Sequence, residues 1–219
     1  MDKLYVIKIG GNIIDDELAL RSFLKSFSEI VGGHTSPPLE PAPQQRGDGG
    51  TKAILVHGGG KLATRIAEAM GVQQQMIDGR RITDAETLKI VTMVYAGFIN
   101  KNIVARLQSF NCNAIGLSGA DGNTIKAHKR LEGKASPSGG GLEGADYGFV
   151  GDIDEVNTTV LNSLLQTNDA VVLAPITHDG KGQLLNTNAD TIAQEVAKAM
   201  SQLYETELIY SFEKPGVLL

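Results

Sequence analysis

The 219-residue sequence has one cysteine, no tryptophan and no apolar run long enough to cross a membrane. Cys112 alone cannot form an intrachain disulfide or a thiolate metal cluster, which is typical of a protein in a reducing cytoplasm. The chain also runs from Met1 almost directly into a strand-like stretch, without the apolar segment of a signal peptide. We therefore expect a cytoplasmic protein that does not span a membrane.

An excess of positive charge is also missing. The chain has 20 Lys and Arg against 25 Asp and Glu, which gives a formal net charge of -5. Nucleic acids and anionic membrane surfaces favour basic partners, so neither is expected as a partner here. Any site for an anion must therefore be local. A hydrophobic content of 42% is sufficient for a sizeable core.

Two common nucleotide-binding fingerprints are absent from the sequence. No Gly-x-x-x-x-Gly-Lys-Ser/Thr occurs, which argues against a P-loop. No Gly-x-Gly-x-x-Gly follows the first strand, which argues against a Rossmann dinucleotide site. The histidines (His34, His57, His128 and His178) are scattered and form no paired metal motif, and we interpret His57 as structural rather than as a base.

What the chain does have is two strand-like runs that end in glycines before a helical pattern. Residues 5–9 lead into Gly10 and Gly11, and residues 53–57 lead into Gly58, Gly59 and Gly60. Glycine lets the backbone N–H groups at a helix start approach an anion closely, and Lys8 adds a positive charge beside the first turn. One such stretch could be only a tight turn, but two in one chain predict a phosphate-binding cradle.

The order of the apolar patterns predicts an α/β fold with a mainly parallel sheet. The apolar run 170–176 is expected to be a central strand, and residues 178–182 a hairpin turn. Residues 32–50 and 131–144 are rich in glycine and proline or serine, so we expect flexible insertions there. Helices are expected at about 14–30, 61–70, 84–109, 158–165 and 190–200, and further strands at about 113–117, 124–127, 147–153 and 207–212.

The helix predicted over 84–109 has more apolar residues than one contact with a sheet can cover. Thr83 to Glu86 has capping-box spacing at its start. A second burial partner is therefore expected, and a homodimer contact is the simplest candidate. Met93 and Tyr95 are the candidates for the outward face of this helix.

Two polar segments leave alternatives open when each is considered alone. Arg80 and Arg81 follow a glycine turn, where they can be solvated charges or can bind a carboxylate. Asn186 to Asp190 forms a polar helix start, and Asp190 alone could be an ordinary negative charge near a helix N-terminus.

Taken together, four segments are similar to motifs of the amino acid kinase family: residues 7–11, 56–60, 78–83 and 186–190. The resemblance implies one domain over 1–219, a three-layer αβα sandwich around a mainly parallel sheet. It places an acyl-amino-acid subdomain at about 1–176 and the start of a nucleotide subdomain at about 177–219. In the family, further elements and a second catalytic lysine follow the position of Leu219, so the resemblance implies a fold that lacks its C-terminal part. Such a chain is expected to bind the acyl amino acid weakly and to turn over little or nothing.

Within the family, the resemblance is strongest to members that phosphorylate the side-chain carboxylate of N-acetylglutamate, the second step of arginine biosynthesis. It implies ATP as phosphate donor, Mg²⁺ held by the nucleotide rather than by a protein metal site, and a homodimer. N-succinylglutamate, or another acid such as carbamate, aspartate or glutamate, remains an alternative substrate. A module that binds the acyl amino acid without catalysis remains an alternative function. The absence of an N-terminal helix before the first strand predicts no inhibition by arginine.

The resemblance also implies a role for each site residue. Lys8 is expected to neutralise charge on the transferring phosphoryl group, and Asp190 to hold that lysine in place. Arg81 and Asn186 are expected to bind the substrate α-carboxylate, and Gly59 and Gly60 to contact the substrate. The remaining residues complete the phosphate cradles or begin the nucleotide loop: Gly10, Gly11, Gly58, Glu213, Lys214 and Gly216.

Overall fold

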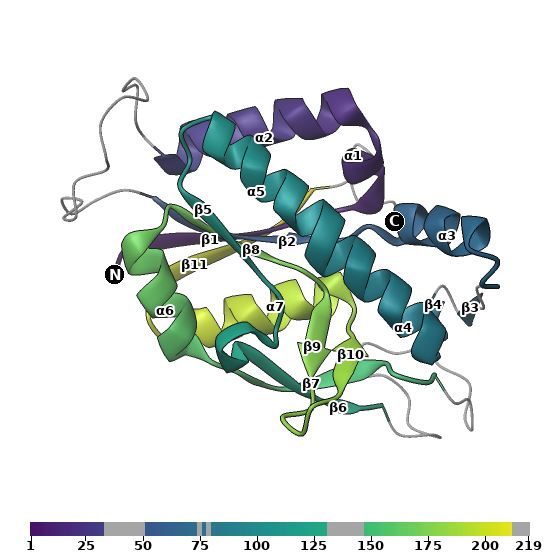
Figure 1. Ribbon diagram of the computed structural model, residues 1–219. Helices are drawn as coiled ribbons and strands as arrows, with labels where there is room; N and C mark the ends of the chain where they lie inside the picture. Colours follow the sequence, from purple (N-terminus) through teal and green to yellow (C-terminus); the bar gives the residue numbers. More distant parts are fainter. Residues whose placement is uncertain (33–50, 74–75, 78–79, 131–146, 212–219) are drawn as a thin grey trace, which may run out of the picture.

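The computed structural model describes residues 1–32, 51–73, 76–77, 80–130 and 147–211 (Figure 1). The insertions predicted over 32–50 and 131–144 fall almost entirely outside these residues. The nucleotide-loop residues Glu213, Lys214 and Gly216 also lie outside them.

The centre of the fold is a five-stranded sheet in which every neighbouring pair is parallel. Its order is β11 (Glu205–Ser211), β1 (Lys3–Ile9), β2 (Lys52–His57), β8 (Ala170–Leu173) and β5 (Ala114–Leu117). Helices cover both faces of the central strands, so β8 is apolar throughout and β2 is apolar between Lys52 and His57. The predicted α/β fold with a mainly parallel sheet is confirmed.

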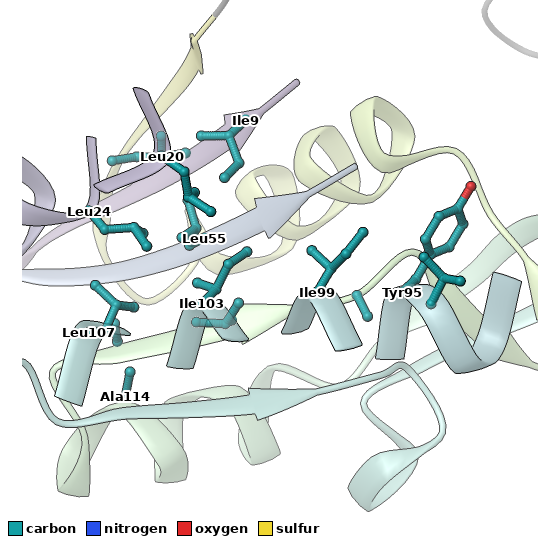
Figure 2. Close-up of a cluster of buried hydrophobic side chains, with 14 of the residues drawn as sticks. Ile9, Leu20, Leu24, Leu55, Tyr95, Ile99, Ile103, Leu107 and Ala114 are labelled. Atoms are coloured by element: carbon teal, nitrogen blue, oxygen red, sulfur yellow. The ribbon is translucent and has the colours of Figure 1, made fainter. Parts of the chain in front are cut away.

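Successive residues of these strands point into two separate cores, one on each face of the sheet. Ala53 and Leu55 of β2 belong to the core under α2 (Glu17–Gly32) and α5 (Asn100–Ser109). Ile54 and Val56 belong to the core over α6 (Thr158–Thr167) and α7 (Ala189–Met200). Figure 1 shows the resulting helix, sheet and helix layers, and Figure 2 shows Ile99, Ile103 and Leu107 facing Leu55.

A smaller four-stranded sheet lies beside the main one (Figure 1). Its order is β10 (Leu184–Asn186), β9 (Ile176–His178), β6 (Ile125–Lys129) and β7 (Gly151–Val156). The predicted hairpin is confirmed, although its turn spans residues 179–183 because His178 pairs with Leu184. Shorter elements complete the described chain: α1 (Gly11–Asp15), α3 (Gly60–Ala69), β3 (Met76–Ile77), β4 (Arg80–Arg81) and the 3₁₀ turn Asp121–Asn123.

The apolar run 170–176 is not one strand, contrary to the prediction. It divides into β8 of the main sheet and β9 of the small sheet, with Ala174 and Pro175 between them. Proline cannot donate a hydrogen bond to a sheet ladder, and the Ile176 N–H donates to the Ala174 carbonyl (2.8 Å) across a tight bend. Apolar character predicted burial correctly but could not show that the chain changes sheet.

Two other boundaries also differ from the prediction. The first helix is two helices, because the Asp16 carboxylate accepts hydrogen bonds from the N–H groups of Leu18 and Ala19 (2.9 Å each) and starts α2 anew. The strand predicted over 147–153 begins only at Gly151, since residues before it form isolated bridges.

The long helix predicted over 84–109 is present, but its middle is a π-helix. It consists of α4 (Ala85–Thr92), a π segment (Met93–Ile99, η1) and α5. Its N-cap is Asp84 rather than Thr83, because Asp84 Oδ1 accepts from the Thr87 N–H (2.7 Å). Met93 is 54% exposed as expected, whereas Tyr95 is 6% exposed and faces the core, so its assignment to the outward face is wrong. No described helix is both long and apolar enough to cross a membrane.

Candidate active site

A cleft of about 220 Å³ lies where the glycine turn after β2 meets the small sheet and the start of α7. Parallel strands present their carboxyl ends at one edge of a sheet, and ligands of α/β folds bind outside that edge. The lining residues come from seven segments: Gly58, Gly59, Gly60, Arg81, Tyr95, Arg130, Val150, Gly151, Pro175, Asn186, Thr187, Asn188, Ala189 and Thr191.

The two predicted glycine turns lie against each other. The Gly58 N–H donates to the Ile9 carbonyl (3.1 Å), and a Cβ on Gly58 would lie 3.7 Å from the Gly11 nitrogen. A Cβ on Gly11 would lie 3.9 Å from the Gly60 nitrogen. The turns that carry Gly10, Gly11 and Gly58 to Gly60 therefore form one backbone surface.

Gly59 occupies a position that only glycine can adopt without strain. Its φ is +144°, and a Cβ there would lie 2.2 Å from Ile99 Cδ1. The π segment supplies the side chains that press against it, because Tyr95 Cδ1 would be 3.3 Å from the same Cβ.

Lys8 and Asp190 meet beside the glycine turns. Lys8 Nζ lies 2.8 Å from Asp190 Oδ1, and the two side chains are 11% and 51% exposed. Asp190 is in the first turn of α7, where a negative charge is favoured by the helix dipole. The hydroxyl of Tyr210 on β11 donates to the Asp190 carbonyl (3.4 Å), and burial together with the Asp190 charge raises the pKa of Tyr210. The pair thus joins β1, α7 and β11 at one point.

Arg81 is buried in the cleft rather than solvated. Its side chain is 8% exposed, and Nη2 donates to the Gly60 carbonyl (3.0 Å) and to Thr64 Oγ1 (2.9 Å). Burial raises the pKa of neighbouring Tyr95, while the positive charge of Arg81 opposes that shift. Of the two interpretations left open by the sequence, the geometry favours a carboxylate-binding arginine.

Asn186 also lines the cleft, at the end of β10. Its Nδ2 donates to Thr83 Oγ1 (3.0 Å), and that hydroxyl donates to the Arg81 carbonyl (3.3 Å). The start of α7 follows, with Asn188 Oδ1 accepting from the N–H groups of Asp190 (2.8 Å) and Thr191 (3.1 Å). The segment predicted from residues 186–190 therefore both lines the cleft and caps a helix.

Arg130 is a lining residue that the sequence analysis missed. It is 8% exposed, its Nε lies 3.2 and 3.1 Å from the two Asp152 carboxylate oxygens, and its guanidinium lies 5.5 Å from the Tyr147 ring centre. Asp152 is on β7, which pairs with β6 directly before Arg130. The signal available in the sequence was an arginine shortly after the strand predicted over 124–127 and an aspartate within the strand predicted over 147–153.

The donor set does not resemble a metal centre. Within the described residues, no group of three or more His, Cys, Asp or Glu side chains is close enough to hold a metal ion. The cleft presents guanidinium, amide and backbone groups instead, which suit carboxylates and phosphates.

Comparison with known proteins gives a consistent result. The family model described as "Amino acid kinase family" matches residues 3–218. The chain is 52% identical over 218 residues to acetylglutamate kinase of Cytophaga hutchinsonii, covering 100% of this chain and 72% of the relative. It is 48% identical over 217 residues to acetylglutamate kinase of Phocaeicola vulgatus, covering 99% and 73%.

Solved structures with lower sequence identity share the fold. Protein smu.665 from Streptococcus mutans superposes with a TM-score of 0.72 at 23% identity, over 99% of this chain and 75% of that chain. N-acetylglutamate synthase from Neisseria gonorrhoeae, solved with coenzyme A and N-acetyl-glutamate, gives a TM-score of 0.72 at 21% identity, over 99% and 42%. At these identities the likeness supports the fold alone.

Proposed function

The chain belongs to the amino acid kinase family, and we propose on this premise that it transfers the γ-phosphoryl group of ATP to the side-chain carboxylate of N-acetyl-L-glutamate. This reaction is the second step of arginine biosynthesis. The observation that carries the proposal is a cleft lined by buried Arg81, by Asn186 and by the helix start whose Asp190 pairs with Lys8, in a chain about half identical to acetylglutamate kinases along its length.

The reaction needs charge neutralisation more than it needs a base. A glutamate carboxylate, with a usual pKa near 4.3, is already ionised at neutral pH and can attack phosphorus directly. The two reactants carry negative charges that must be brought together in line. A preorganised cation or backbone N–H in a water-poor cleft contributes about 3–4 kcal/mol to such a step.

The roles follow from where the groups lie. Lys8 is held by Asp190 at the glycine turns and neutralises the transferring phosphoryl group. Arg81 and Asn186 bind the α-carboxylate, and the backbone of Gly59 and Gly60 meets the acceptor carboxylate. Gly10, Gly11 and Gly58 form the rest of the cradle. Among the described residues, the lining of the cleft includes two arginines and no carboxylate that could pair with a free ammonium, which supports a substrate whose amino group is blocked.

ATP with Mg²⁺ is the proposed donor. The ion is carried by the nucleotide phosphates, and Glu213, Lys214 and Gly216 are proposed to begin the nucleotide loop. We place the acyl-amino-acid subdomain at about 1–176 and the nucleotide subdomain from about 177, with Asn186 contributing to the acyl-amino-acid site from beyond this boundary. We also propose a cytoplasmic homodimer that pairs through the helix at 84–109, on whose surface Met93 and Phe98 are 54% and 60% exposed.

Trapping the acyl phosphate with hydroxylamine tests the proposal. The expected result is hydroxamate from N-acetylglutamate that depends on ATP and Mg²⁺, with N-succinylglutamate as the competing substrate that identifies the acyl group. Lys8→Met should lower kcat about 100-fold or more, because it removes one preorganised charge. Lys3→Met is the matched control: Lys3 is on the same strand but pairs with Glu207 at the surface (2.8 Å, 43% exposed), so its loss should leave kcat unchanged.

Absence of hydroxamate with either acyl-glutamate would refute the kinase assignment. Calorimetry then tests the remaining alternative, a module that binds the acyl amino acid without catalysis. Binding of N-acetylglutamate without binding of an ATP analogue would identify a non-catalytic binding module.

A further inference from the structure

His57 is a buried titratable group that the mechanism above does not use. It is the last residue of β2, directly before the glycine turn, and is 0% exposed. It does not line the cleft, whereas the three glycines that follow it do. Any effect of His57 on the reaction must therefore pass through the backbone.

The hydrogen bonds of His57 fix one tautomer. Nδ1 lies 2.8 Å from the Gly58 carbonyl oxygen, which can only accept, so Nδ1 carries the proton. Nε2 is then the acceptor, and it lies 3.3 Å from Nδ2 of Asn100, which can only donate. A second proton would have to sit on Nε2, where it would face the Asn100 N–H group, so two donors would point at each other. Burial accordingly lowers the pKa of His57 to about 4.

Asn100 is itself firmly placed. It is 0% exposed at the junction of the π segment and α5, and Nδ2 also donates to the Val172 carbonyl of β8 (3.0 Å). Gly116 leaves the room for it, because a Cβ there would lie 2.0 Å from Asn100 Oδ1. His57 is therefore held between the main sheet and the helix that also presses Tyr95 and Ile99 against Gly59.

The bond to the Gly58 carbonyl has a direct consequence for the next N–H. The Gly58 carbonyl and the Gly59 N–H belong to one planar trans peptide, so they point in opposite directions. Holding the carbonyl toward buried His57 therefore turns the Gly59 N–H away from His57, and Gly59 is one of the residues that line the cleft. In the described part of the chain, no backbone carbonyl accepts from this N–H.

We infer that His57, held by Asn100, is a positioning residue that aims the Gly59 N–H at the acceptor carboxylate during phosphoryl transfer. This inference rests on the proposed function. The N–H donates to the nucleophile and so fixes its approach to phosphorus. Because a misplacement of about 1 Å can cost about 100-fold in rate, a misaimed donor lowers kcat more than it weakens substrate binding.

Two amide substitutions separate positioning from packing. In His57→Asn the side-chain Nδ2 takes the place of the ring Nδ1 and can still donate to the Gly58 carbonyl. In His57→Gln the amide extends to the place of Nε2 and the bond to Gly58 is lost. Both are neutral and polar, but Asn leaves the larger cavity, so a packing defect should harm His57→Asn more, the opposite of what positioning predicts.

In the hydroxamate assay, kcat of His57→Gln should fall about 100-fold, as for loss of one preorganised donor, with the dissociation constant of N-acetylglutamate by calorimetry changed less than about threefold. His57→Asn should keep more than about a tenth of the parent kcat. His128→Gln is the control, since His128 is exposed and bound to Asp154 (2.6 Å) away from the turn. Equal losses in the Asn and Gln variants would overturn the inference.

Nuclear magnetic resonance gives a test that does not depend on activity. Ring ¹⁵N spectra of the parent chain, with His57 assigned by its loss in His57→Asn, should show a neutral ring protonated at Nδ1 from pH 5 to 8. Both substitutions remove the ring current of the imidazole, but the Gly59 amide signal should move further in His57→Gln than in His57→Asn. An Nε2-protonated ring, or a Gly59 signal that responds equally to both substitutions, would refute the inference even if the chain formed no acyl phosphate.

Discussion

Replacing Gly59 with alanine should be among the most destabilising single-methyl additions in this protein. Two costs combine at this position. A non-glycine residue at φ +144° carries about 1–3 kcal/mol of backbone strain. The new Cβ would lie 2.2 Å from Ile99 Cδ1, and forcing a methyl into a filled core costs a further 1–3 kcal/mol or so. We therefore expect the free energy of unfolding, measured by urea denaturation, to fall by about 2–6 kcal/mol.

Two other glycines allow the costs to be separated. Gly71→Ala has a positive φ of +75° but nothing within 4 Å of its Cβ, so it reports strain alone. Gly60→Ala has ordinary φ and its nearest neighbour at 3.9 Å, so it should cost little. Ile99→Ala should remove the clash and thus be less damaging in combination with Gly59→Ala than the sum of the two single changes. If Gly59→Ala cost no more than Gly71→Ala, the close packing of the π segment on the glycine turn would be refuted.

Three further predictions concern the cleft, a helix cap and the surface. Arg81→Lys should raise KM for N-acetylglutamate about 10-fold or more with a smaller change in kcat, since lysine cannot reproduce the planar set of donors of a guanidinium. Arg65→Lys is the control: Arg65 is exposed, so this change should leave KM unchanged. The pKa of Asp84 lies below its usual value because its carboxylate accepts from the Thr87 N–H. The cap therefore stabilises the fold fully at any pH above the usual pKa of aspartate, and this stabilisation is lost as the pH falls through the lowered pKa of the folded state. Asp84→Ala should therefore cost about 1 kcal/mol at pH 7, and the difference should vanish in urea titrations at acid pH. Phe98→Glu should convert a dimer to monomers by light scattering while Leu18→Glu does not; an unsubstituted chain that is monomeric at micromolar concentration would contradict the dimer.

The sequence predicted what local patterns determine. Glycine after a β-branched run placed both glycine turns correctly. The spacing of apolar residues located most helices and strands to within a few residues. The side chains brought to the cleft from distant segments, such as Arg81 and Asn186, were identified through the family resemblance and not from their neighbours alone.

What the sequence could not predict depends on tertiary contacts. The bend at Pro175 sends one apolar run into two sheets, and no local signal distinguishes that from a single buried strand. Tyr95 lies four residues from both buried Val91 and buried Ile99, so helical spacing alone places it on the buried face and its outward assignment ignored that pattern. Arg130 was not predicted as a site residue because it is held in place by Asp152, which lies on the neighbouring strand β7 and is distant in the sequence.

The π segment also makes the protein sensitive to residue number rather than residue type. Each residue of an α-helix turns the chain by about 100°, and a π segment accommodates one residue beyond that periodicity. Deleting a single residue between Met93 and Ile99 would allow regular α-helix to form but would rotate either Tyr95 or Asn100 out of phase with the glycine turn. Insertions and deletions here should therefore be far less tolerated than substitutions at the exposed positions Met93 and Phe98, even though both kinds of change fall on the same stretch of helix.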